Sequence, residues 1–201
     1  LDKDTTGCIV VAKTQEALVK LQIQIQKRVA SRNYLAVVHG AIKDNEGMIV
    51  GCIGRHPKDR KKYAVVDDES GRYACTHWKL IQNLGNFSLL RFKLDTGRTH
   101  QIRVHAMAHG LPLVGDKLYL GGYKMFQRFK DGVATESDHQ EMELSRHALH
   151  AIGININYKK NKQKFVTKLP SDFKSFINKN FNLNESDLLK IIYSEINSYF
   201  N

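Results

Sequence analysis

The most constraining feature of this sequence is a motif-rich stretch, TGRTHQIRVHAMAHGLPLVGDKLY, at residues 96–119. Its opening Thr-Gly pair is a turn signal, and the residues that follow carry apolar side chains at helical spacing, with Ile102 and Ala106 on one face. Gly110 and Pro112 predict the end of that helix. The stretch therefore predicts a short helix enclosed between two turns.

Hydrogen-bond donors crowd onto this predicted helix. Within one or two turns the chain carries Arg98, His100, Gln101, Arg103, His105 and His109. A plain surface helix rarely holds so many donors with so few acceptors. Because guanidinium groups bind carboxylates and phosphates strongly, we expect the partner to be an anion or a buried carboxylate.

The charge of the whole chain points the same way. Lys and Arg number 31 against 20 Asp and Glu, which gives a formal net charge of +11. Such an excess favours nucleic acid or another polyanion as the partner, although a generically basic protein would look similar. We expect a monomeric protein that binds no membrane.

Cysteine usage bounds the compartment and the metal chemistry. The three cysteines, Cys8, Cys52 and Cys75, include no C-x-x-C pair, so the sequence predicts neither a disulfide framework nor a zinc knuckle. His105 and His109 have zinc-ligand spacing, but the glutamate of an H-E-x-x-H site is absent. No apolar run approaches ~18 residues, so the sequence predicts no membrane span, and with this cysteine usage we expect a cytoplasmic protein. Because the sequence has no Walker loop and no G-x-G-x-x-G motif, we expect neither a metal nor a cofactor.

Strand and helix patterns alternate irregularly along the chain, which predicts an α+β fold. The apolar run at residues 8–12 predicts a strand buried on both faces. A helix is predicted over residues 15–28, capped by Thr14, with Leu18, Leu21 and Ile25 facing inward. Further strands are predicted at residues 34–39, 48–53, 72–81, 87–94, 146–155 and 164–167.

Two later segments have less regular patterns. Residues 124–143 show no clean period and predict an insertion or a long loop. The last thirty residues return to helical spacing, with an apolar stripe formed by Leu188, Leu189, Ile192 and Ile196. We therefore expect a main domain at residues 1–173 and a helical extension at residues 174–201.

Several polar residues allow both a structural and a functional interpretation. Asp2 and Asp4 are turn formers beside Gly7, or one of them is a catalytic carboxylate held by an arginine. Tyr34 is a core residue at a strand start, or a flat ring that stacks on a base. The basic loop at residues 55–62 is simply solvated, or it contacts phosphates.

Seven motifs occur in an order and spacing that resembles the RluA-type pseudouridine synthases, in particular the RluC/RluD group. The motifs are LDKDTTGCIVVAKT, RNYLAVVHG, RHPKDRKKYAV, TGRTHQIRVH, GLPLVGDKLY, RHALHA and FVTKLPSDF. They cover the chain from its first residue to about residue 173. The resemblance implies a mixed, largely antiparallel sheet flanked by helices, followed here by a C-terminal helical tail.

The resemblance also implies roles for individual residues. The family's catalytic aspartate falls on Asp2, its base-stacking tyrosine on Tyr34, and the arginine paired with the aspartate on Arg103. Other expected pocket residues are Arg98, His100, Phe165 and Leu169, with Pro170 beside them. The loop residues expected to contact RNA are Arg55, Lys58, Arg60, Lys61 and Lys62.

The reaction implied is the isomerisation of uridine to pseudouridine in structured RNA, without a cofactor. Large-subunit ribosomal RNA is the expected substrate, and transfer RNA is the alternative. A non-catalytic RNA-binding or ribosome-assembly factor on the same fold is a further alternative, and a metal-dependent RNA hydrolase lacks the acidic clusters that it needs. Because the His-Arg that relatives place before Leu1 is absent, we expect this chain to be part of a longer protein and poorly active alone.

Overall fold

A largely antiparallel sheet forms the centre of the molecule. The computed structural model describes residues 1–67, 69–159 and 161–181, together with 184, 186, 187, 189, 190, 193 and 194. The strands are β1 (Thr6–Gly7), β2 (Ser31–His39), β3 (Glu46–Arg55), β4 (Tyr63–Val66), β5 (Arg72–Leu84), β6 (Phe87–Leu94), β7 (Leu149–Tyr158) and β8 (Asn161–Val166). Their order is β1-β7-β2-β6-β5-β3-β4, with β8 also paired to β7, and β1 is parallel to β7. The expected α+β fold is confirmed.

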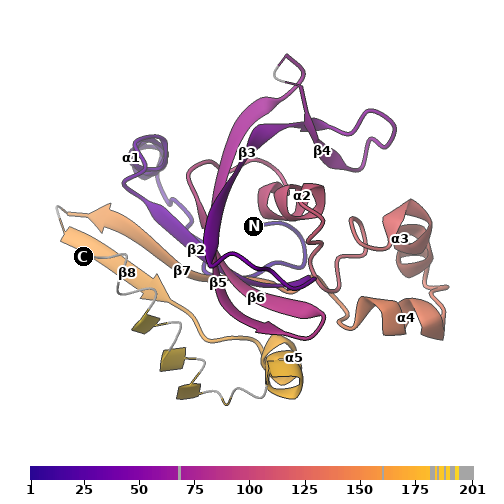
Figure 1. Ribbon diagram of the computed structural model, residues 1–201. Coiled ribbons are helices and arrows are strands. Elements are labelled where there is room, and N and C mark those ends of the chain that lie inside the picture. Colours follow the sequence, from indigo (N-terminus) through magenta and orange to yellow (C-terminus); the bar gives the residue numbers. More distant parts are fainter. Residues whose placement is uncertain are drawn as a thin grey trace.

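Helices cover both faces of this sheet (Figure 1). The helices are α1 (Gln15–Gln26), α2 (Gln101–Ala108), α3 (Gly122–Asp131), α4 (Glu136–Met142) and α5 (Ser171–Phe181). Because side chains alternate along a strand, β2 contributes to two cores. Leu35 and Val37 pack in the cluster that contains α5, whereas Ala36 and Val38 pack in the cluster that contains α2. β2, which lies between β7 and β6, is therefore buried on both faces.

The strand predicted at residues 8–12 is wrong. The strand at this position is only Thr6–Gly7, and Ile9 and Val11 are exposed. The reason lies in the edge of β7, where β1 pairs with His150 and Ala151 and β8 takes over from Gly153 onward. The apolar run has no unpaired edge of β7 to continue along.

The first helix confirms its predicted position but not its predicted packing. Thr14 caps α1 by accepting a hydrogen bond from Ala17 N at 3.2 Å. Leu18 and Ile25, expected to face inward, are 40% and 39% exposed, and Leu21 is half-buried. Helical spacing shows which side chains share a face, but it does not show that another element covers that face.

Residues 124–143 were expected to form an insertion or a long loop. The loop is wrong, because most of these residues lie in α3 and α4. Thr135 caps α4 in a capping box with Asp138, and Arg128 of α3 pairs with the same aspartate. In α3, Met125 is buried and Phe126 packs against a core cluster, but a helix of this length has too few turns to show a clear apolar period in the sequence.

The C-terminal part of the described chain belongs to the core. Helix α5 buries Phe173, Phe176, Ile177 and Phe181 against the sheet. The expected boundary between residues 173 and 174 falls inside this helix. Most of the predicted apolar stripe, at residues 188, 192 and 196, lies outside the described residues. Among the residues that the structure describes, no helix has the length and apolar character needed to cross a membrane.

Candidate active site

The turn that carries Asp2 is fixed by its own backbone and by β1. Thr5 N donates to the carbonyl oxygen of Asp2 at 3.1 Å, and Asp4 takes a left-handed conformation with φ 73°. Aspartate tolerates that conformation better than most residues. Gly7 has φ 114°, and a Cβ there would lie 2.2 Å from the carbonyl oxygen of Ala151. Glycine is therefore required where the turn joins the sheet.

Two histidines near the start of β7 hold the two threonines that follow the turn. Thr5 Oγ1 is 2.7 Å from His147 Nε2, and Thr6 Oγ1 is 2.8 Å from His150 Nδ1. Both histidines are buried. Side chains more than 140 positions away in the sequence thus orient the segment that presents Asp2.

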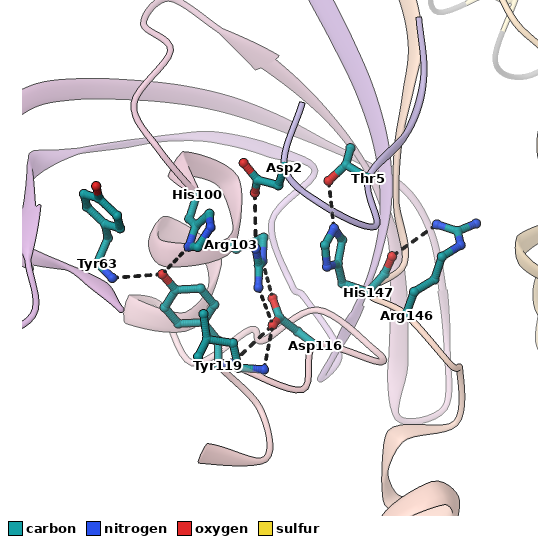
Figure 2. A network of polar contacts seen from close by, with 10 residues as sticks. Asp2, Thr5, Tyr63, His100, Arg103, Asp116, Tyr119, Arg146 and His147 are labelled. Carbon is teal, nitrogen blue, oxygen red and sulfur yellow. Dashed lines mark hydrogen bonds and ion pairs between the residues drawn. The ribbon is translucent and has the colours of Figure 1, made fainter. Parts of the chain in front are cut away.

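Arg103 lies between two carboxylates, as Figure 2 shows. Its Nη1 is 3.3 Å from Asp2 Oδ2, while its Nε and Nη2 donate to Asp116 at 2.7 and 2.8 Å. The Arg103 side chain is 7% exposed and that of Asp116 is 1% exposed, whereas Asp2 keeps 23%. The planar fork is therefore fixed by the deeper carboxylate and presents its remaining nitrogen to the shallower one.

Burial and pairing act in opposite directions on the charges of this group. Burial disfavours the Arg103 cation, but its hydrogen bonds to Asp116 raise its pKa above the ordinary value. Burial likewise disfavours the Asp116 anion, and Arg103 still holds its pKa below the usual range. Each partner keeps the other ionised, so a permanent positive charge faces Asp2.

Asp116 belongs to the site, but the sequence does not mark it as a functional group. The Gly115-Asp116 pair predicts only a turn, although it stands in the motif GLPLVGDKLY. Its carboxylate also accepts the backbone N–H groups of Leu118 and Tyr119, each at 3.2 Å. A buried aspartate needs such a set of donors, and the excess of donors on α2 was the available signal.

A cavity of about 360 Å³ opens beside Asp2. Its lining includes Asp2, Thr5, Tyr34 and Arg98, so three residues predicted for the pocket meet there. Arg98 is oriented by a hydrogen bond from its Nε to the carbonyl oxygen of Tyr73 at 2.9 Å. Burial raises the pKa of Tyr34, which keeps its hydroxyl protonated at neutral pH. The cavity thus combines a carboxylate, a flat ring and a cation.

Two expected pocket residues lie elsewhere. Phe165 is on β8, where its side chain is 49% exposed, and Leu169 packs against the core cluster around α5. Neither lines the cavity at Asp2. The reason is that β8 pairs with the later part of β7, from Gly153 to Tyr158, whereas the cavity is bounded by the first residue of β7.

His100, Arg103 and part of the basic loop line a second cavity. This cavity measures about 490 Å³ and its lining includes Arg55, Arg60 and Lys61. Lys58 is exposed outside it, and Lys62 lines a different hollow next to Tyr63. The structure therefore brings three of the five predicted RNA contacts together with the helix that carries Arg103.

One group of described side chains has spacing suited to a metal ion. His77 Nε2 lies 3.1 Å from Asp95 Oδ2 and 3.7 Å from Cys75 Sγ. The same Asp95 oxygen is 3.3 Å from the guanidinium of Arg28, so the carboxylate already has a cationic partner. His105 does not belong to this group, because it is buried against Thr76 Oγ1 at 2.9 Å.

We expect acid to destabilise this fold, because several of its histidines are buried. Burial lowers the pKa of His105, His147 and His150 to about 4, from an ordinary value of 6.5. Between those two pH values the unfolded chain binds more protons, so the free energy of unfolding falls as the pH falls through that window. At about 1.4 kcal/mol per pKa unit, each histidine contributes at most about 3.5 kcal/mol.

Urea unfolding at pH values above and inside this window measures the effect. We expect His147→Gln to flatten the pH dependence and the exposed His139→Gln, which is outside the buried group, to leave it unchanged. A free energy of unfolding that stays constant from neutral pH to about pH 4 would contradict the assignment of these histidines as buried and neutral.

Comparisons with known proteins agree with this geometry. Residues 1–108 match the family described as RNA pseudouridylate synthase. The ribosomal large subunit pseudouridine synthase D of Pseudomonas aeruginosa is 43% identical over 176 residues, which cover 86% of this chain and 52% of the relative. An uncharacterized RNA pseudouridine synthase of Synechocystis is 52% identical over 120 residues, covering 59% of this chain and 37% of the relative.

A solved structure supports the same relationship. Human RNA pseudouridylate synthase domain containing 1 is 26% identical, with a TM-score of 0.66, covering 85% of this chain and 67% of the human one. The chain spans about half the length, or less, of the curated relatives that it matches. The chain belongs to the RNA pseudouridylate synthase family, as the order of its seven motifs predicted.

Proposed function

We propose that this chain is the catalytic part of an enzyme that isomerises specific uridines to pseudouridine in large-subunit ribosomal RNA. Membership of the family supports the reaction, and the names of several relatives, ribosomal large subunit pseudouridine synthase D, support the substrate. The observation that carries the proposal is the carboxylate of Asp2, 3.3 Å from Arg103 and at the wall of a cavity that also holds Tyr34.

Asp2 is the group that acts at carbon 1′ of the ribose. The reaction breaks the bond between that carbon and nitrogen 1 of uracil, turns the base, and joins carbon 5 to carbon 1′. The proton of carbon 5 leaves and nitrogen 1 gains one, so no external reagent is consumed. The carboxylate serves this sequence either as a nucleophile or as a base that stabilises positive charge at the sugar.

Arg103 and Tyr34 prepare the carboxylate and the base. The Arg103 cation faces Asp2 and orients one of its oxygens, because Asp116 fixes the other side of the fork. The ring of Tyr34 offers a flat, half-buried surface on which uracil stacks.

The substrate base reaches the cavity only after it leaves its own helix. Flipping a base out of a stacked duplex costs roughly a few kcal/mol. Contacts between the phosphates and the basic loop offset that cost, and the loop residues proposed for this role are Arg55, Lys58, Arg60, Lys61 and Lys62. Such contacts position the RNA without reading its sequence.

Release of tritium from RNA that carries uridine labelled at carbon 5 tests the reaction. In the full-length form of the protein, which all the activity assays use, we expect release in proportion to the number of target uridines, with no added metal or cofactor. Tight RNA binding without release would favour the non-catalytic alternative. Mapping pseudouridines in ribosomal and transfer RNA from cells that lack the protein distinguishes the two substrates.

Replacement of Arg103 by lysine should not be conservative. Lysine keeps the charge, but a single ammonium group cannot make the two bonds to Asp116 and also reach Asp2. We expect Arg103→Lys to lower the rate of pseudouridine formation about tenfold or more, equal to about 1.4 kcal/mol. A near-normal rate in single-turnover assays would show that Asp2 does not depend on the guanidinium fork.

A further inference from the structure

The second cavity shares its walls with the cavity at Asp2. On the N-terminal turn, Asp2 and Thr5 line the first cavity, whereas Lys3 and Asp4 line the second. At the start of α2, Gln101 lines the first, whereas His100 and Arg103 line the second. The N-terminal turn and the start of α2 therefore line both cavities. Asp2, which lines the first cavity, contacts Arg103, which lines the second.

Positive charge dominates the second cavity. Besides Arg103, its basic lining residues are Lys3, Arg55, Arg60, Lys61, Lys117 and Arg146. The carboxylates in its lining are Asp4 and Asp116, and Asp116 is already paired with Arg103. An anionic ligand that entered this cavity would meet a large excess of cations.

Two of these cations lie over aromatic rings, which hold them in place without neutralising their charge. The guanidinium of Arg55 lies 4.6 Å from the centre of the Tyr63 ring and donates to the carbonyl oxygen of Arg60 at 3.0 Å. The ammonium of Lys117 lies 4.5 Å from the centre of the Phe129 ring. Aromatic rings fix the cations without neutralising them, so less conformational entropy is lost when an anion binds.

His100 adds a neutral donor to the same cavity. Its backbone is in the left-handed region, with φ 58°, a strained conformation of the kind found at functional sites. Its Nδ1 lies 2.9 Å from the hydroxyl of Tyr119, which itself accepts the N–H of Tyr63 at 3.1 Å (Figure 2). This contact fixes the orientation of the His100 ring, and a neutral ring carries one N–H donor.

The charge states of this pair agree with a neutral ring. Burial raises the pKa of Tyr119 to about 12, so the hydroxyl keeps its proton. Burial and the neighbouring Arg103 lower the pKa of His100, so its ring is neutral at physiological pH. The donor that His100 offers to the cavity is thus a fixed N–H group rather than a cation.

We infer that the second cavity binds a phosphodiester of the RNA strand next to the uridine whose base occupies the first cavity. This inference rests on the proposed function, because it assumes that the ribose of that uridine lies at Asp2. A base in the first cavity with its sugar at Asp2 leaves the adjoining phosphate beside Arg103. The clustered cations and the His100 donor match the oxygens of such a group.

Two double variants with the same change of charge test the inference. Arg60→Gln with Lys117→Gln removes two cations from the second cavity, whereas Lys13→Gln with Lys43→Gln removes two exposed cations outside it. Binding of a fluorescent uridine-containing stem-loop RNA is measured between about 50 and 200 mM salt, because each phosphate contact to a single strand contributes about 0.7 to the salt slope.

We expect the cavity variant to bind RNA at least about tenfold more weakly and to lose about 1.4 from the salt slope, while the control keeps both values. Equal effects of the two double variants would overturn the inference. Pyrophosphate is the second probe. If it binds the unsubstituted protein and the control but not the cavity variant, while RNA affinity is unchanged in all three, the cavity takes a small anion and the RNA assignment is wrong.

These binding measurements need no turnover, so they fail independently of the proposed reaction. Loss of the salt slope in the cavity variant, with no tritium release by the unsubstituted protein, would retain the phosphate subsite and reject the isomerase. Tritium release without any change in salt slope would retain the isomerase and reject the subsite. His100→Asn, which keeps a donor and tolerates the left-handed backbone, should bind RNA more tightly than His100→Ala.

Discussion

Asp2→Asn is expected to abolish pseudouridine formation while leaving the fold intact. The substitution keeps the size of the side chain and removes the negative charge that acts at carbon 1′. Arg103 retains its two bonds to the buried Asp116, so the core below Asp2 keeps its pairing. We expect no tritium release above background from labelled RNA, and a free energy of unfolding within about 1 kcal/mol of the unsubstituted protein.

The neighbouring Asp4→Asn serves as the matched control. Asp4 lies in the same turn, but it lines the second cavity rather than the one at Tyr34. We expect this variant to retain measurable turnover. Turnover by a folded Asp2→Asn protein, or equal losses in the two variants, would show that Asp2 is not the reacting carboxylate.

Asp116→Asn is expected to have the largest effect on stability. Asp116 is fully buried and is the bidentate partner of an arginine whose side chain is 7% exposed. Without Asp116, the Arg103 cation keeps only the longer contact with the partly exposed Asp2, and breaking a buried ion pair typically costs about 3–5 kcal/mol. We also expect a large loss of activity, because Arg103 would no longer be held in the orientation that serves Asp2.

Asp172→Asn provides the comparison at a more accessible ion pair. Asp172 pairs with Arg146 at 2.8 Å, but its side chain is 35% exposed. Solvent screens such a pair, so we expect a change within about 1 kcal/mol. Chemical unfolding of both variants decides the matter, and an equally small change for Asp116→Asn would mean that Arg103 finds another partner or is hydrated.

The regular elements with local signals were predictable from the sequence. Thr14 marks the start of α1, and Gly110 and Pro112 mark the end of α2, because capping and helix termination depend on residues close in the chain. The antiparallel pairing of β5 and β6 followed from their alternation across a short turn. The order of the motifs identified the family before any contact was known.

Burial and pairing depended on neighbours that the local sequence does not reveal. Ile9 and Val11 read as core residues, but β8 occupies the edge of β7 that they would need. The apolar face of α1 is equally clear in the sequence, yet Leu18 on that face is 40% exposed. The short helices α3 and α4 were not predicted, because each has too few turns to show a clear apolar period, and α4 is defined by a capping box and by the ion pair of Arg128 with Asp138.

The same distinction between local sequence and tertiary packing applies to the candidate site. By itself, the sequence determined the residue types of the site, since its motifs named Asp2, Tyr34 and Arg103 and the donor-rich helix called for an anionic partner. The resemblance also implied that Arg103 pairs with Asp2. Only the tertiary structure decided that Asp116 holds the other side of Arg103, and that Phe165 lies away from the cavity. Asp2 and Arg103 are about a hundred positions apart, and their contact depends on how β1, β7 and α2 pack, because only packing determines which charges share a low-dielectric interior.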